Sequence, residues 1–428
     1  MIDYSTMLPR RQSTFVLRWV VLLIVFAGTV TVSRLYSKEV EPADDRDDAY
    51  RNIALFTRAL EQIRSNYVDK DKVSYEQLIR GAMRGMMDSL DDHSQFLDKD
   101  MYDDMQDDTK GQFGGLGIVI SIKDNTLSIV SPMEDTPGFR AGLMSDDRIL
   151  EIDGAKTDGI TLPEAVKRLR GEPGTQVRLK VLRPATQDVT VYELERAEIK
   201  VPSVKDARML DDGIGYIRIT QFNEPTAMAL QAEIDALRTN GLRALVLDLR
   251  NNPGGLLRSA IDVSQKFLRS RDVIVSTQGR RAGDQQVFRA GGRERLLDLP
   301  MVVLVNSGSA SASEIVAGAL QDHRRAILVG EKTFGKGSVQ SVLPMEEGSA
   351  LRLTTAKYYT PSNRMIHELG IEPDIVVPMS PEDWSALMER RAVRTPLDEG
   401  EDGPVDVQLE RALSVLRGIL IYQARGSR

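Results

Sequence analysis

The sequence predicts an α/β protein of several domains, in which a small β-barrel is inserted ahead of the main α/β core and helices form the N-terminal region. Apolar residues recur at helical spacing between residues 50 and 90. Residues 118–182 have the pattern of short strands around one helix, which is typical of a small, partly open β-barrel. After Val201, strands alternate with helices, and this alternation indicates a layered α/β core.

Composition narrows the functional classes. The chain has 428 residues, enough for about two to four domains of roughly 100–200 residues each. A net charge of −7 argues against nucleic acid as the main partner, and a hydrophobic content of 41% argues against a disordered chain. Cysteine is absent, which excludes disulfides, Cys-ligated zinc, Fe–S clusters and thiol nucleophiles. The three histidines (His93, His323 and His367) are too widely spaced to suggest a histidine-rich metal site.

The N-terminal segment, residues 1–38, has the pattern of an export signal. Arg10, Arg11 and Arg18 precede an apolar run from Trp19 to Val32, which is shorter than the roughly 20 residues that span a bilayer. No clear small-residue cleavage site follows, so a cleaved signal peptide and a retained membrane anchor both stay open. In either case we expect the protein to be exported, to the periplasm or the outer face of the inner membrane.

A glycine-rich loop, Gly111–Gly117, leads into a strand that begins near Ile118. Glycine-dense backbone allows successive N–H groups to point into one concavity that suits an anion. An extended peptide can then add to an exposed strand edge with its terminal carboxylate held in that concavity. On these residues alone, a flexible turn fits equally well. The candidate tail-binding residues are Gly114, Gly115, Leu116, Gly117 and Ile118.

A serine-rich segment, Asn306–Glu314, follows the apolar strand Met301–Val305 and opens a helix. A serine at a helix N-terminus lies where unpaired N–H groups and the helix dipole favour an oxyanion. Capping of the helix by one of the four serines explains the pattern as well, and taken alone this simpler explanation is preferred. The residue types do not show which serine would be a nucleophile.

A serine nucleophile needs a base, and a lysine is the better candidate here. His323 falls near the expected end of the helix, and the other two histidines lie in unrelated segments. Lys336 follows a predicted strand and has apolar and glycine neighbours; burial would lower its pKa and favour the neutral amine. Gln340, four residues later, is placed to orient that amine. An ordinary surface lysine is the alternative.

Two further turns are informative. Gly330–Lys336 has the G-x-x-x-x-G-K spacing of a nucleotide-binding P-loop, but Gly337 stands where the magnesium-binding Ser or Thr belongs, and a β-like segment follows instead of a helix. We therefore disfavour a nucleotide site. Asp248–Gly255 closes a buried strand with a Gly-Gly pair, which could aim an N–H at an oxyanion or be only a turn.

The motifs together resemble the carboxyl-terminal processing peptidases, a tail-specific serine–lysine family. Thr136–Gly154 and its surrounding strands resemble a PDZ domain, and the similarity covers about residues 50–378. The other segments that carry the resemblance, in the family's order, are Leu90–Leu97, Asp248–Leu256, Ser309–Asp322, Val329–Gln340 and Tyr359–Asp374. Asp92 stands where the family usually has Pro, and Asn363 with His367–Leu369 replaces a more Gly-rich turn, which leaves the local loop geometry there in question.

The resemblance implies a crotonase- and Clp-like α/β protease core and a serine endopeptidase activity without metal or cofactor. Carried over by position, Ser311 is the nucleophile, Lys336 the general base and Gln340 its orienting partner. The implied oxyanion donors are the N–H groups of Ala312 and Gly255. A non-catalytic PDZ-bearing scaffold is the alternative function, and the presence of all three polar residues argues against it.

The implied organisation and partners complete the prediction. Expected substrates are proteins with exposed C-terminal tails, while an adaptor protein, membrane attachment through the N-terminal segment and self-association stay open. The expected divisions are 1–38 (signal or anchor), 39–109 (helical region), 110–200 (PDZ domain), 201–379 (protease core) and 380–428 (tail with an amphipathic helix).

Overall fold

The computed structural model describes residues 43–123, 126–133, 135–291, 296, 298–380, 382–387 and 405–426. The chain separates into two compact units, Met1–Gly85 and Met86–Arg428. The predicted signal or anchor, residues 1–38, lies outside the described residues. Within the described part of the chain, no helix combines the length and the apolar character that crossing a bilayer requires.

The N-terminal unit is helical, as the periodicity predicts. It contains α2 (Ala43–Asn66), a short 3-10 turn and the start of α3 (Tyr75–Asp88). Tyr75 joins the two helices, because its hydroxyl donates to Glu61 at 2.6 Å and its ring lies 3.5 Å from the Arg64 guanidinium carbon. These contacts fasten the helical hairpin at its turn.

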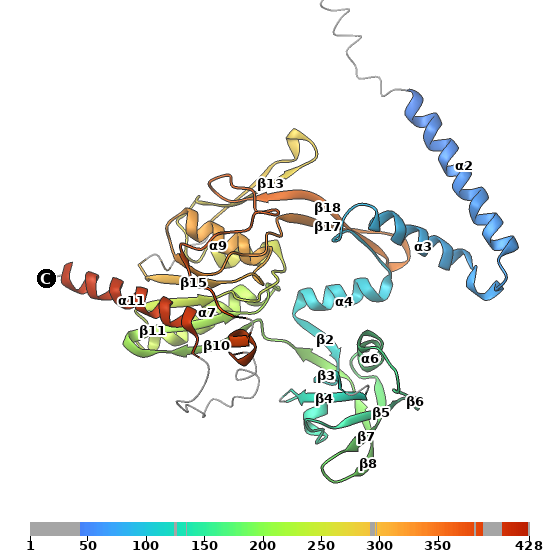
Figure 1. Ribbon diagram of the computed structural model, residues 1–428, viewed down its shortest axis with the longest axis horizontal. Helices are drawn as coiled ribbons and strands as arrows, with labels where there is room; N and C mark the ends of the chain where they lie inside the picture. The colour runs from blue at the N-terminus through green and yellow to red at the C-terminus, as the bar shows by residue number, and fades with distance from the viewer. Residues whose placement is uncertain are drawn as a thin grey trace, which may run out of the picture. The chain divides into compact units, whose positions relative to one another are not determined.

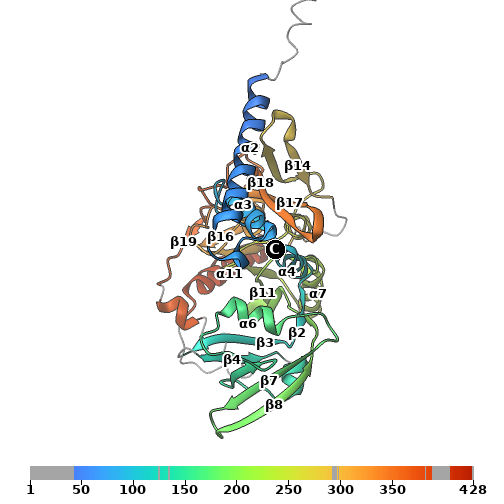
Figure 2. The same cartoon turned by 90° about the vertical axis from the view of Figure 1, so that its right-hand side faces the viewer.

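The second unit begins with α4 (Lys99–Lys110), whose N-terminus is capped by Asp98 and which ends at Gly111 in a left-handed conformation. The next strand, β2 (Gln112–Gly115), pairs with β9 (Ala197–Lys200). The residues between β2 and β9 in the sequence form an antiparallel sheet with two short helices, α5 (Pro137–Arg140) and α6 (Leu162–Leu169). Its strands in spatial order are β3 (Ile118–Lys123), β4 (Thr126–Pro132), β5 (Arg148–Ile152), β7 (Gln176–Arg183) and β8 (Asp188–Glu195), with β6 (Ala155–Lys156) beside β5. Figure 2 shows α6 alongside β3.

The α/β core that follows is built on a mostly parallel sheet of six strands (Figure 1). Its strands in spatial order are β10 (Val204–Met209), β11 (Ile214–Ile219), β12 (Ala244–Asp248), β15 (Met301–Val305), β16 (Ile327–Gly330) and β19 (Ile375–Val376). Within this sheet, only the β10–β11 pair is antiparallel. Every residue of β12 and β15 is buried, as expected for parallel strands covered on both faces.

Helices cover the two faces of this sheet unequally. One face packs on α7 (Thr226–Thr239), α8 (Leu257–Ser264) and α9 (Ala312–Asp322). The opposite face packs on the single helix α11 (Val407–Gly426). Because successive side chains of a strand point to opposite faces, Asp248 lies on the same face as Ala244 and Val246, toward α11.

A second sheet flanks the first. Two of its strands, β13 (Val273–Gly279) and β14 (Gln286–Arg289), pair as an antiparallel hairpin. The parallel strands β12, β15 and β16 end at Asp248, Val305 and Gly330, so the three predicted site segments leave the same edge of the main sheet. The second sheet consists of β1 (Gln95–Leu97), β18 (Ala350–Tyr359), β13 (Val273–Gly279) and β14 (Gln286–Arg289), with β17 (Ser338–Pro344) paired to β18.

Candidate active site

Ser311 lies at the N-terminus of α9, directly before its first residue. Its φ of 55° is unusual for a residue other than glycine, and surrounding contacts must hold it. Its backbone N–H donates to the carboxylate of Glu314 at 2.8 Å. The neighbouring residue Ala312 is fully buried and supplies one of the first-turn N–H groups that have no partner inside a helix.

The Gly254–Gly255 pair packs directly against this helix start. A Cβ atom on Gly254 would lie 2.8 Å from the Cβ of Ser311 and 2.8 Å from the backbone nitrogen of Ala312. A Cβ on Gly255 would lie 2.1 Å from the carbonyl oxygen of Phe222. Both glycines also have positive φ, 101° and 141°, so a side chain at either position would be strained and would collide.

This packing brings two candidate oxyanion donors to one place. The backbone at Gly254 is pinned by Phe222, whose N–H donates to the Gly254 carbonyl at 2.8 Å. Among the described residues, no hydrogen bond uses the N–H of Gly255 or of Ala312. Two unused N–H groups beside a serine at a helix start are suited to bind a developing negative charge.

Glu314 connects the serine segment to the lysine segment. Its carboxylate is fully buried and accepts four hydrogen bonds. Two come from the backbone N–H groups of Ser311 at 2.8 Å and Lys336 at 2.9 Å; the others come from the Thr333 hydroxyl at 2.6 Å and the Gly335 N–H at 2.7 Å. Burial raises the pKa of Glu314, while these four donors act to lower it. One buried carboxylate therefore sets the spacing of the two backbones.

Lys336 is half-buried in the loop between β16 and β17. Burial lowers the pKa of its ammonium group, and the positive charge of Arg352 lowers that pKa further. Arg352 is itself fixed, because its guanidinium donates to the His93 carbonyl at 3.3 Å and to Gln95 at 2.8 Å. A lysine in this setting is easier to deprotonate than one in water.

The side chains of Ser311, Lys336 and Gln340 are not hydrogen-bonded to one another in the described structure. The Gln340 amide donates instead to the hydroxyls of Ser338 at 2.8 Å and Thr354 at 3.3 Å. The structure thus brings together the backbones that carry Ser311, Ala312, Gly255 and Lys336, but not Gln340 with the lysine amine.

Some functional contacts were not anticipated from the sequence. The S-x-x-E spacing of Ser311 and Glu314 is a capping-box signal and could have indicated Glu314. No local signal indicates Arg352, which reaches the lysine only through the β17–β18 pairing. His323 donates from Nε2 to the Val273 carbonyl at 2.7 Å, at the far end of α9 from Ser311.

The P-loop alternative fails for a specific physical reason. The N–H groups of Gly335 and Lys336, which would have to cradle phosphate, donate to the Glu314 carboxylate. The segment after Lys336 is the strand β17, so this loop does not lead into a helix whose N-terminus would bind phosphate, as a P-loop does. Within the described residues, no cluster of three or more acidic or histidine side chains could hold a metal ion.

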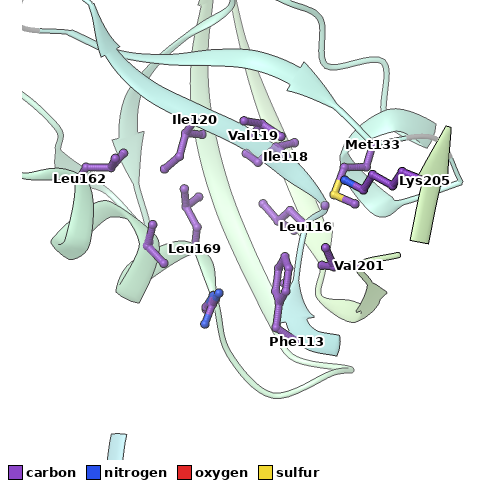
Figure 3. Close-up of a pocket in the computed structure, with 14 residues that line it drawn as sticks. Phe113, Leu116, Ile118, Val119, Ile120, Met133, Leu162, Leu169, Val201 and Lys205 are labelled. Carbon is purple, nitrogen blue, oxygen red and sulfur yellow. The ribbon is translucent and has the colours of Figure 1, made fainter. Parts of the chain in front are cut away.

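A groove of about 480 Å³ lies between β3 and α6 (Figure 3). Four of the predicted tail-binding residues line it: Gly115, Leu116, Gly117 and Ile118. No described hydrogen bond uses the N–H groups of Leu116 or Gly117. Gly114 lies elsewhere, in the β2–β9 ladder, where its Cα faces the Gly171 carbonyl oxygen. The remaining lining is mainly apolar, from Phe113, Val119, Ile120, Met133, Leu162, Val166, Leu169 and Val201, with Arg170 and Lys205 as its charged members.

Comparison with known proteins agrees with this architecture. Residues 213–377 match peptidase family S41, residues 128–183 match a PDZ domain, and residues 24–101 match the N-terminal domain of the activating protease CtpB. A carboxy-terminal-processing protease of Bartonella bacilliformis is 41% identical over 94% of both chains. A carboxyl-terminal-processing protease of Synechocystis is 38% identical over 83% of this chain and 81% of its own length.

The solved structure of a photosystem II D1 C-terminal processing protease is 29% identical, with a TM-score of 0.45 over 76% of this chain and 92% of that one. The sequence relationship with the Bartonella protein extends over nearly the whole length of both chains. The matched S41 segment contains five of the six strands of the main sheet, from β11 to β19, and the matched PDZ segment contains β5, β6 and β7 of the antiparallel sheet. The chain is therefore a member of the carboxy-terminal processing proteases, serine-type peptidases of family S41 that carry a PDZ domain.

Proposed function

We propose that the chain is an exported endopeptidase that cleaves proteins at or near their C-termini, with Ser311 as nucleophile and Lys336 as general base. The groove beside Leu116 and Gly117 takes the substrate tail. Its apolar lining suits a nonpolar terminal side chain, and the two unused N–H groups suit the terminal carboxylate. Binding of the tail then delivers a neighbouring peptide bond to the protease core.

In the proposed reaction, neutral Lys336 takes the hydroxyl proton of Ser311, and the oxygen attacks the peptide carbonyl. The oxyanion accepts hydrogen bonds from the Ala312 and Gly255 N–H groups and is favoured by the N-terminus of α9. Lys336 then gives its proton to the leaving amine. A water molecule, deprotonated by Lys336, hydrolyses the acyl-enzyme and restores Ser311.

The observation that carries this proposal is the shared carboxylate of Glu314. It holds the N–H groups of Ser311 and Lys336 at 2.8 and 2.9 Å, so the two segments have a fixed separation. The lowered pKa of Lys336 supports its use as a base. Because Gln340 is bonded to Ser338 and Thr354, we propose that the described state is a resting one. Tail binding would then allow Gln340 to turn toward Lys336.

Export is the second part of the proposal. Its support is the basic segment followed by the apolar run Trp19–Val32. Fractionation of cells that express the full chain would test it, and protein confined to the cytoplasm would contradict it.

The activity test uses an unstructured protein with a nonpolar C-terminal tail. We expect wild type to degrade it and Ser311→Ala to be inactive. Ser307→Ala is the matched control, since Ser307 is an exposed serine of the same loop and should be dispensable. Equal cleavage by wild type and Ser311→Ala would overturn the assignment.

A further inference from the structure

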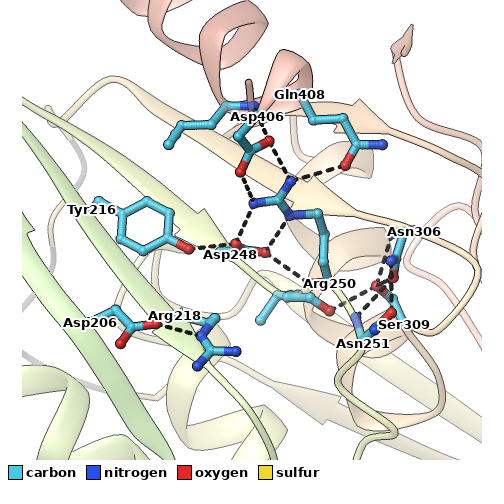
Figure 4. Close-up of polar contacts among 12 residues, drawn as sticks. Asp206, Tyr216, Arg218, Asp248, Arg250, Asn251, Asn306, Ser309, Asp406 and Gln408 are labelled. Atoms are coloured by element: carbon cyan, nitrogen blue, oxygen red, sulfur yellow. Dashed lines mark hydrogen bonds and ion pairs between the residues drawn. The ribbon is translucent and has the colours of Figure 1, made fainter. Parts of the chain in front are cut away.

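A buried charge cluster lies on the α11 face of the main sheet, at the end of β12 (Figure 4). Its centre is the guanidinium of Arg250, whose side chain is completely buried. Toward its own strand, Arg250 donates to the Asp248 carboxylate from Nε at 3.0 Å and from Nη2 at 2.7 Å. The hydroxyl of Tyr216 donates to the same carboxylate at 2.6 Å.

The opposite side of the guanidinium is held by the start of the C-terminal helix. Nη1 and Nη2 donate to the two carboxylate oxygens of Asp406, each at 2.8 Å, and Nη1 also donates to Gln408 at 3.1 Å. The five N–H groups of the guanidinium are therefore all used, in two bidentate pairs and one further bond. Gln408 is fixed in turn, because its amide donates to the Val377 carbonyl at 2.8 Å.

The residues that follow Arg250 form the loop that carries Gly254 and Gly255. Asn251 has a φ of 52°, and its N–H donates to the side chain of Asn306 at 2.8 Å. Asn306 returns a hydrogen bond to the Asn251 side chain at 2.7 Å. The next carbonyl, of Asn252, accepts from the Ala310 N–H at 3.0 Å. The loop is thus tied to the segment that ends at Ser311, and Arg250 is its first anchored residue.

This loop needs external support because two of its non-glycine residues have a strained backbone. Asn251 and the adjoining Ser311 have positive φ, at 52° and 55°, whereas Gly254 and Gly255 reach 101° and 141° without that cost. Conformations of this kind persist only when neighbouring contacts over-determine them. The ion pair with Asp406 holds Arg250, the first residue of the loop, and it comes from the segment before α11, which is not part of the sheet.

Packing alone already secures α11. Ala412, Leu416 and Leu420 are buried against the sheet, so the helix does not need a buried ion pair to dock. Compared with apolar residues of similar volume, a buried ion pair often adds little net stability, but the two bidentate pairs of Arg250 fix the orientation of its guanidinium. Asp406 and Gln408 also lie outside residues 213–377, the part of the chain that matches family S41.

We propose that Asp406, supported by Gln408, is a positioning residue for hydrolysis: it holds Arg250, and through Arg250 the loop that aims the Gly255 N–H at the oxyanion. The inference rests on the proposed Ser311 chemistry. It makes the C-terminal helix part of the catalytic apparatus and not only a cover of the sheet. An oxyanion donor that is misplaced weakens transition-state binding, so the loss should be in kcat and not in KM.

The test compares Asp406→Asn with Leu416→Ala in the full chain, with cleavage of the unstructured tail protein measured as kcat and KM and with thermal unfolding of each variant. The amide of Asn would turn an NH₂ group toward the guanidinium and remove one of the two bidentate acceptors. We expect kcat to fall about tenfold or more with KM unchanged. Leu416→Ala should lower the unfolding temperature and leave the kcat of the folded fraction at the wild-type value.

Gln408→Met is a milder second variant in case Asp406→Asn does not fold, and a fall in kcat of about threefold is expected from the loss of one acceptor. Wild-type kcat in either Asp406→Asn or Gln408→Met would overturn the inference. So would a loss of kcat in Leu416→Ala as large as that in Asp406→Asn, because the effect would then be general destabilisation. The Ser311→Ala variant separates the two proposals. If Ser311→Ala cleaves the tail protein like wild type, the proposed serine chemistry is wrong. If Ser311→Ala is inactive while Asp406→Asn and Gln408→Met keep wild-type kcat, only the proposed role of Asp406 is wrong.

Discussion

The protease core and the PDZ domain hold their candidate functional groups in opposite physical settings. In the core, the groups that hold the site segments are acidic and buried: Glu314, which bonds the Ser311 and Lys336 backbones, and Asp248, which bonds Arg250, are both 0% exposed. In the PDZ groove, the lining is mainly apolar and the polar contacts available to a ligand come from the backbone of Leu116 and Gly117.

The two sites differ in whether side-chain or backbone atoms make the essential contacts. A buried carboxylate with four donors has no substitute, since removing one acceptor leaves buried N–H groups unpaired. Backbone N–H groups are supplied by every residue except proline, and an apolar wall can be built from many side chains. We therefore expect substitutions in the core to abolish catalysis and substitutions in the groove to alter substrate affinity by degrees.

The largest effect should come from Lys336. Lys336→Ala and Lys336→Arg should each lower kcat at least about 10³-fold, because alanine removes the base and a guanidinium cannot be deprotonated. The measurement is cleavage of the tail protein under saturating substrate. Lys332→Arg is the matched control, since Lys332 is exposed and forms an ion pair with the exposed Glu372 at 2.8 Å. Substantial activity in Lys336→Arg would mean that another group is the base.

Glu314→Gln should have the next largest effect. The Gln amide keeps one acceptor oxygen but places an NH₂ group against backbone N–H groups that donate to the carboxylate in the wild-type protein. Some of these buried donors then lose their acceptor. We expect kcat to fall about 100-fold and unfolding free energy to fall by about 1–3 kcal/mol, measured by urea denaturation. Glu372→Gln, on the exposed partner of Lys332, should change neither quantity. If Glu314→Gln lost stability but kept kcat, the carboxylate would be structural only.

Local patterns in the sequence were sufficient for the main architecture. The alternation of strands and helices after Val201 predicts the layered α/β core that the structure has, and the apolar strand expected before Ser311 is present as β15. The strands and helices expected there are present. Which of four serines is the candidate nucleophile came from the family resemblance, because all four lie in one loop and helix start with similar neighbours.

Contacts between distant segments could not be predicted in this way. The donors to Glu314 come from the helix start and from the loop at Thr333–Lys336, and their meeting depends on how β15 and β16 pair. Arg250 and Asp406 are 156 residues apart in the chain. The partners of Gln340 depend on its rotamer and on the β17–β18 register, including the irregularity between Val339 and Gln340. Composition and periodicity specify none of these.

A substitution in the PDZ groove should weaken binding of the substrate tail without abolishing catalysis. Val166 lines the groove from α6 and is half-buried. Val166→Asp places a charge where the nonpolar tail would dock, so we expect KM for the tail protein to rise about tenfold with kcat nearly unchanged. Val189→Asp, at an exposed position of β8, is the control. A loss of kcat with unchanged KM would show that the groove acts on catalysis rather than on capture.

The smallest effect should appear in the pH profile of an Arg352 variant. Burial is the main cause of the lowered pKa of Lys336, and the positive charge of Arg352 is the secondary cause. Removing that charge in Arg352→Gln raises the pKa of Lys336, so a larger fraction is protonated at neutral pH. Since only the neutral amine is a base, the rise of kcat with pH should move to higher pH in this variant.

The control for this last prediction is Arg352→Lys, which keeps the positive charge but loses the fork that contacts His93 and Gln95. Its kcat profile should stay with that of wild type if electrostatics are responsible. If both Arg352 variants move together, the hydrogen bonds to His93 and Gln95 act through loop geometry instead. If the pH profile of kcat is unchanged in both variants, the charge of Arg352 has no measurable effect. Burial alone then lowers the pKa of Lys336, through the same exclusion of water that surrounds the Glu314 carboxylate.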